Sequence, residues 1–128
     1  MMTRKFIAVS LLLILSGVLA YAQGEAKTVT IKGYLIDNAC AGAPGDDKDS
    51  AEEAKEHKTS CALMPSCTAS GFAVAEGRKI YKLDEAGNKL ALDVLNATKT
   101  KKGLKVEVEG TVEGTTLHAT KLTEVAAK

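Results

Sequence analysis

Two alternating segments near the C-terminal end place the strongest constraint on how this chain can fold. The first segment runs from Leu104 to Val112. The second, Thr116 to Val125, follows it after the turn residues Glu113-Gly114. Alternation with a period of two residues is typical of strands that bury one face, so residues 104–125 are predicted to form a β-hairpin. The apolar positions of its first strand are Leu104, Val106, Val108 and Val112.

The second strand of this hairpin changes face partway along its length. Its inward positions begin as Leu117 and Ala119 but resume at Leu122. A shift of one residue in the alternation predicts a β-bulge, which we place near Thr120.

Three further strands are predicted upstream of the hairpin. Residues 27–35 alternate, and Gly33 within them indicates a bend or the close approach of another backbone. Two shorter segments, Phe72 to Ala75 and Lys79 to Leu83, are predicted to pair as a hairpin around Glu76-Gly77-Arg78.

Short helices are predicted between the strands. Ser50-Ala51-Glu52-Glu53 has the composition of a capping box and predicts a helix over residues 51–57. Pro65 to Ser70 is expected to form one or two helical turns that end at Gly71.

The segment after Leu83 is less regular. Residues 84–88 are predicted as a turn, and the stretch that ends at Thr98 fits either a strand or a short helix. The helix is favoured because Leu90, Val94 and Leu95 recur at helical spacing.

The predicted order is strand, insertion over residues 38–70, two strands, short helix and two strands. This order is that of an OB-type fold, so we predict a mainly β domain over residues 27–128, built as a small five-stranded antiparallel barrel. An open antiparallel sheet with one helix packed on it is the competing architecture. Residues 23–26 are predicted to form a flexible tail.

Residues 1–22 have the three parts of a secretory signal peptide. Arg4 and Lys5 precede the apolar run from Phe6 to Leu19, and Ala20-Tyr21-Ala22 supplies small residues before a cut at Gln23. The apolar run is shorter than the roughly 20 residues that span a bilayer. We therefore expect a periplasmic or secreted protein that is not held in the membrane after cleavage.

The charge of the remaining chain argues against a nucleic-acid partner. Loss of the leader lowers the number of Lys and Arg residues from 17 to 15 against 16 acidic residues, so the net charge changes from +1 to −1. Such a chain lacks the basic surface that binds phosphates. The expected partner is an envelope protein or a small ligand, which could lie on the barrel face over Tyr34, Phe72 and Tyr81.

Soft metal ligands gather in the predicted insertion. Three thiols and one imidazole match a tetrahedral structural zinc set, and copper would also accept thiolates, with Met64 as an added ligand. Asp37 just precedes the insertion and is expected either to support a metal-bound histidine or to end the strand as a turn residue. The predicted ligands are Cys40, His57, Cys61 and Cys67.

Two other uses of the thiols remain open. Exported proteins commonly form disulfides, but three cysteines leave one unpaired. A thiol redox protein that uses Cys61 and Cys67 is the second alternative, although the sequence has no Cys-x-x-Cys motif.

The remaining polar residues carry weaker signals. His118 is predicted to be a surface residue without a role, and Asp46, Asp47 and Asp49 a solvated loop rather than a calcium site. The sequence has no Ser-His-Asp order, phosphate-binding glycine loop or paired-carboxylate signature, so we assign no catalytic residue and favour a non-catalytic role.

Several of these residues together resemble a group of small exported bacterial proteins of unknown function. The resemblance rests on the residues from Gly33 to Cys40, on His57, on the residues from Cys61 to Cys67, and on Ser70-Gly71-Phe72. It implies a Gly-x-x-x-Asp-x-x-Cys strand end, a Cys/His insertion and an OB-like barrel. It also implies that Asp37, Cys40, His57, Cys61 and Cys67 act together, and it indicates no substrate.

Overall fold

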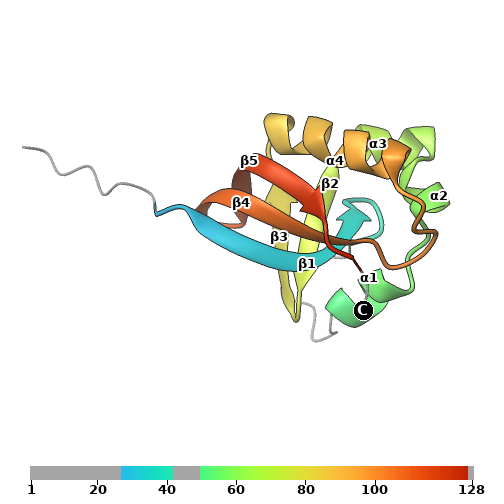
Figure 1. Ribbon diagram of the computed structural model, residues 1–128, viewed down its shortest axis with the longest axis horizontal. Helices are drawn as coiled ribbons and strands as arrows, with labels where there is room; N and C mark the ends of the chain where they lie inside the picture. Colours follow the sequence, from blue (N-terminus) through green and yellow to red (C-terminus); the bar gives the residue numbers. More distant parts are fainter. Residues whose placement is uncertain (1–26, 42–49, 127–128) are drawn as a thin grey trace, which may run out of the picture.

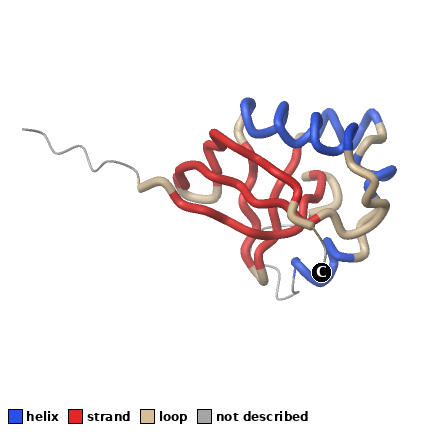
Figure 2. Tube along the Cα trace, viewed as in Figure 1, coloured by secondary structure: helices blue, strands red, loops and turns tan. Residues whose placement is uncertain are grey.

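The computed structural model describes residues 27–41 and 50–126. The predicted signal peptide, the predicted tail and the three loop aspartates between residues 45 and 50 lie outside these ranges. The described part forms a small barrel with helices on its outside (Figures 1 and 2). In chain order the elements are β1 (Val29–Asp37), α1 (Ser50–Lys55), α2 (Thr59–Ala62), α3 (Pro65–Ser70), β2 (Phe72–Glu76), β3 (Lys79–Leu83), α4 (Glu85–Ala97), β4 (Lys105–Glu113) and β5 (Thr116–Glu124).

The five strands close into a barrel in the order β1-β2-β3-β5-β4, which confirms the predicted OB-like architecture. One pairing differs from the prediction, because β3 and β5 run parallel through Lys82↔Thr116 and Leu83↔Leu117. Strand directions cannot alternate all the way around a closed ring of five, so one parallel contact is unavoidable. The other four pairings are antiparallel.

The barrel interior is filled by the inward side chains of the alternating strands. α4 closes part of the core by packing against β2, β3 and β5 (Figure 1). A second, smaller cluster lies on the other face of β1 and β2, where Ala54 of α1 packs with Ile36 and Ala73. The end of β1 is therefore covered on both faces, which is why its last three residues are all buried. The largest fully buried apolar side chains are Phe72, Leu104, Leu117, Val74, Val106 and Val108.

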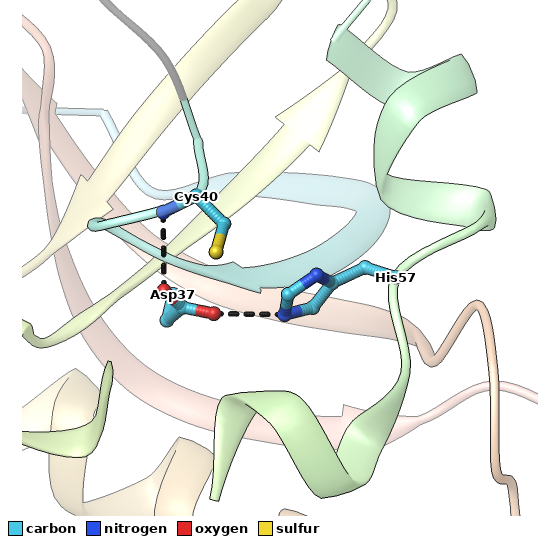
Figure 3. A group of neighbouring side chains, drawn as sticks. All are labelled: Asp37, Cys40 and His57. Carbon is cyan, nitrogen blue, oxygen red and sulfur yellow. Dashed lines mark hydrogen bonds and ion pairs between the residues drawn. The ribbon is translucent and has the colours of Figure 1, made fainter. Parts of the chain in front are cut away.

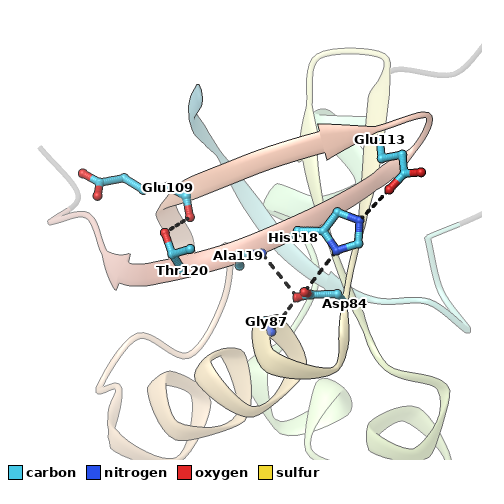
Figure 4. Close-up of polar contacts among 7 residues, drawn as sticks. All are labelled: Asp84, Gly87, Glu109, Glu113, His118, Ala119 and Thr120. Atoms are coloured by element: carbon cyan, nitrogen blue, oxygen red, sulfur yellow. Dashed lines mark hydrogen bonds and ion pairs between the residues drawn. The ribbon is translucent and has the colours of Figure 1, made fainter. Parts of the chain in front are cut away.

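Two irregular positions of the sheet agree with the sequence analysis. A Cβ on Gly33 would lie 2.4 Å from the carbonyl oxygen of Ala75, so the predicted close backbone approach is present. The β4–β5 register shifts at Glu109/Gly110, which leaves Thr120 as the extra residue of a bulge. Its hydroxyl donates to the carbonyl oxygen of Glu109 at 3.1 Å (Figure 4).

The turn predicted over residues 84–88 is wrong, because these residues begin α4. Asp84 is the N-cap of the helix, and its carboxylate accepts the backbone N–H of Gly87 at 2.8 Å. Gly87 is a weak helix former, but it lets the helix lie against the sheet, since a Cβ there would be 3.1 Å from the Cβ of Ala119. Tertiary packing thus extends the helix by a turn beyond the periodic apolar residues.

His118 has contacts that the sequence did not indicate. Its ring lies between two carboxylates, with Nδ1 3.3 Å from Asp84 and Nε2 3.2 Å from Glu113 (Figure 4). The residue therefore connects the start of α4 to the end of β4. Among the described helices, none has the length and hydrophobicity needed to cross a membrane.

Candidate metal centre

Asp37, the last residue of β1, organises the turn that follows it. Its side chain is fully buried, and Oδ2 accepts the backbone N–H of Cys40 at 3.1 Å. The main-chain oxygen of Asp37 accepts from Cys40 and Ala41 as well. A carboxylate that bonds backbone N–H groups a few residues further along the chain is a common way to close a turn. The i, i+3 spacing therefore places the Cys40 side chain beside the Asp37 carboxylate.

The turn is fixed to the end of α3. The Asn38 side chain donates to the carbonyl oxygen of Ser70 at 2.8 Å, and the Asn38 backbone N–H donates to that of Gly71 at 2.9 Å. Gly71 ends the helix with φ +80°, a conformation that glycine adopts without strain. These bonds hold the beginning of the insertion against its end.

His57 approaches from the other side of the insertion, between α1 and α2. Its backbone N–H donates to Ala54, and its carbonyl oxygen accepts from Gly103 at 3.0 Å. The imidazole is largely buried, and its Nε2 lies 2.7 Å from Oδ1 of Asp37 (Figure 3). Residues 101–103, which precede β4, thus hold the backbone that carries the imidazole.

Asp37, Cys40 and His57 form a compact set of potential ligands. One ligand atom from each lies within 4.8 Å of the others (Figure 3). Oδ1 of Asp37 and Nε2 of His57 are both buried, and they pair with each other at 2.7 Å without any further hydrogen-bond partner. Buried polar groups generally have partners, and here each of the two atoms has only the other. A cation bound by both atoms and the neighbouring thiol would replace this contact.

The thiol of Cys40 is held in its neutral form in the absence of metal. Partial burial, together with the neighbouring Asp37 carboxylate and Cys67, raises the pKa of Cys40 to about 11. The same effects disfavour a reactive thiolate at neutral pH. A cation bound at this position would reverse the balance by stabilising the thiolate.

The other predicted ligands stand apart from this set. Cys67 lies on α3 and is one of the groups that raise the pKa of Cys40, but it is not part of the group of three. Cys61 lies on α2, outside the group, and Met64 is 52% exposed. The structure brings together two of the four predicted ligands and adds Asp37, which the sequence indicated only as a supporting residue. All three cysteines are free thiols.

The aromatic residues do not form an exposed platform. Phe72 is 1% exposed and belongs to the core, so its predicted place in a ligand-binding face is wrong. The ring of Tyr34 is covered by the ammonium groups of Lys55 and Lys105. Tyr81 lines a cavity of about 380 Å³ between β3 and the β4–β5 turn.

Replacing Gly103 with alanine is expected to disturb the site without removing a ligand. Gly103 has φ +65°, and a Cβ would lie 2.6 Å from the carbonyl oxygen of Lys55, two residues before His57. Backbone strain of about 1–2 kcal/mol and overpacking of about 1–3 kcal/mol should lower the free energy of unfolding. Chemical denaturation measures this loss.

Gly114 provides the matched control for Gly103. It has φ +62°, but a Cβ there would meet nothing within 4 Å. Gly114→Ala should show the strain alone and keep any metal affinity, whereas Gly103→Ala should lower both. Equal losses of unfolding free energy and of metal affinity in the two variants would show that the contact with Lys55 has no influence on the site.

Comparison of the chain with known protein families, with curated proteins and with solved structures gives no significant match.

Proposed function

We propose that this chain is an exported, non-catalytic metal-binding protein, in which Asp37, Cys40 and His57 bind one divalent transition-metal ion. The observation that carries the proposal is the buried pair of ligand atoms, Oδ1 of Asp37 and Nε2 of His57, which have no partner except each other and lie beside the Cys40 thiol. A bound cation would satisfy both atoms.

The donor set favours zinc, with copper as the competing ion. One oxygen, one nitrogen and one sulfur ligand suit a borderline ion such as Zn²⁺, whereas Cu(I) prefers several sulfur ligands. Ligand atoms around tetrahedral zinc lie roughly 3.3–3.8 Å apart, as follows from bonds of about 2.0–2.3 Å. The ligand atoms here lie within 4.8 Å of one another. Oδ1 of Asp37 and Nε2 of His57 are 2.7 Å apart and would have to separate by roughly 0.6–1.1 Å to bind the ion, with water at the remaining position.

Asp37 is proposed as a direct ligand rather than as a supporting residue. Oδ1 of Asp37 lies 2.7 Å from Nε2 of His57, so an ion bonded to this nitrogen would also lie within reach of the carboxylate. A carboxylate that only supported the histidine would contact the ring nitrogen that does not bind the metal. Since Oδ2 already accepts from Cys40, Oδ1 is the oxygen available to the metal.

Zinc binding to the purified domain, residues 23–128, tests the proposal. Titration should give one Zn²⁺ per chain, and zinc at about one hundred times the dissociation constant should raise the free energy of unfolding by about 2.7 kcal/mol. His57→Ala should abolish the stabilisation. His118→Ala removes the other histidine, which is not part of the group, and should keep it.

A more conservative variant tests the role of Asp37. Asp37→Asn keeps an oxygen that can accept the Cys40 N–H but removes the charge. Loss of a supporting residue costs about 10–100-fold in affinity, so a direct ligand should cost more than about a hundredfold. The metal proposal fails if wild type binds neither Zn²⁺ nor Cu²⁺, or if His57→Ala binds as well as wild type.

A further inference from the structure

The turn after β1 brings a second thiol to the proposed metal site. Besides the two bonds of Asn38, the backbone N–H of Ala39 donates to the Ser70 hydroxyl at 3.2 Å. That hydroxyl in turn donates to the carbonyl oxygen of Cys67 at 2.6 Å. The residue before Cys40 is thus linked through one side chain to the backbone of Cys67. Cys67 is also one of the groups that raise the pKa of Cys40, which agrees with this placement.

From this geometry we propose that Cys40 and Cys67 form a disulfide under oxidising conditions, and that this bond switches the metal site off. The proposal rests on the function proposed above, because Cys40 is one of the three ligands. A disulfide sulfur is not a thiolate and no longer ligates the ion. Only Asp37 and His57 would then remain.

The oxidant is a disulfide, for which oxidised glutathione serves as the probe. The Cys40 and Cys67 sulfurs become joined by a single bond, and two electrons pass to the oxidant, whose S–S bond breaks to give two thiols. The two protein thiol protons go to these products when the site is empty. When zinc is bound at Cys40, that thiolate leaves the ion, zinc is released, and the second product thiol takes its proton from water. Cys40 is an exposed residue, so the oxidant can reach it.

The pairing also accounts for the odd number of cysteines. Of the three, Cys61 lies on α2, while the Cys40 turn is fixed to α3. One disulfide therefore forms between Cys40 and Cys67, and Cys61 stays reduced. A link between the turn and α3 ties residues that the fold already holds together, so little rearrangement is needed.

Peptide mapping identifies the pair. After oxidation of the metal-free protein and alkylation of free thiols, trypsin and cyanogen bromide cleave the chain. Cleavage after Met64 separates Cys61 from Cys67, which trypsin alone does not do. The expected product links peptide 33–48 to peptide 65–78, and peptide 59–64 carries an alkylated Cys61. A link that includes Cys61, or the recovery of three alkylated thiols, overturns the pairing.

Zinc release under the same oxidant tests the switch. The reduced wild type should lose its zinc on oxidation and regain it after reduction, as read with a colorimetric zinc indicator. Cys67→Ser should bind zinc when reduced and keep it under the oxidant, whereas Cys61→Ser should behave as wild type. Retention of zinc by an oxidised, cross-linked wild type overturns the switch.

The two experiments separate this inference from the function on which it rests. The mapping uses metal-free protein, so it reports the disulfide whether or not the protein binds zinc. If reduced wild type binds no metal, the proposed metal function and the proposed switch are both wrong. The peptide mapping alone then shows whether Cys40 and Cys67 form a disulfide.

Discussion

Lowering the pH from about 8 to about 6 is expected to weaken zinc binding by at least about a hundredfold. The pKa of Cys40 is raised to about 11 in the metal-free protein, so its thiol is protonated throughout this range. Zinc binds the thiolate and must displace that proton, which lowers the affinity about tenfold for each unit of pH. Competition with a chelating indicator at several pH values measures this dependence of zinc affinity on pH.

The stability of the metal-free fold should not follow this slope. Cys40 faces Asp37 and Cys67, and its pKa is raised from 9.0 in the fold. A raised pKa contributes stability that is fully present below the unfolded value and is lost only as the pH rises from about 9 to about 11. Denaturation curves between about pH 6 and 8 should therefore show no change in stability caused by Cys40. A fall in zinc affinity over the same range is then not explained by unfolding through this residue. The Cys40→Ser variant should bind zinc more weakly and with a shallower slope, and a slope equal to that of wild type would contradict the role of the thiol.

Phe72→Ala is expected to have the largest effect on folding, a loss of about 3–5 kcal/mol. The side chain is 1% exposed and is one of the largest in the core, so its removal leaves a cavity. A domain of this size has a total stability of about 5–15 kcal/mol. The midpoint of thermal unfolding should fall by roughly 12–40 °C, at about 4–8 °C for each kcal/mol. Circular dichroism during heating measures the shift.

Two comparisons sharpen the Phe72 experiment. Met64→Ala removes another large apolar side chain, but one that is 52% exposed, and should change the stability by no more than about 0.5 kcal/mol. Phe72 also pairs with Asp37 across β1 and β2, so zinc should recover part of the stability lost in Phe72→Ala. A loss below about 1 kcal/mol in Phe72→Ala would mean that the core repacks around the missing ring.

Most of the barrel could be predicted because its strands bury one face and therefore alternate. The bulge at Thr120 and the close approach at Gly33 follow from the same pattern. The start of α4 could not be predicted in this way, because the helix gains its first turn from the Asp84 cap and from contact with β5. Such contacts between residues distant in the sequence leave no periodic signal.

The candidate site was predicted in its location but only partly in its members. The sequence placed Cys40 and His57 in one insertion, yet spacing alone does not say which thiols reach the imidazole. That depends on how the turn after β1 docks on α3 and how residues 101–103 hold His57. The available signal for Asp37 was its position at a strand end, three residues before a cysteine.

The parallel contact that closes the barrel is much shorter than the hairpin beside it. β3 and β5 meet through two residue pairs, whereas β4 and β5 pair along their whole lengths. Local opening of a fold begins where the fewest bonds must break, which here is the β3–β5 seam beside the cavity at Tyr81. Asp37, Cys40 and His57 lie on β1, on its turn and between α1 and α2, none of which belongs to that seam. Local opening at the seam would therefore leave the arrangement of these three side chains unchanged.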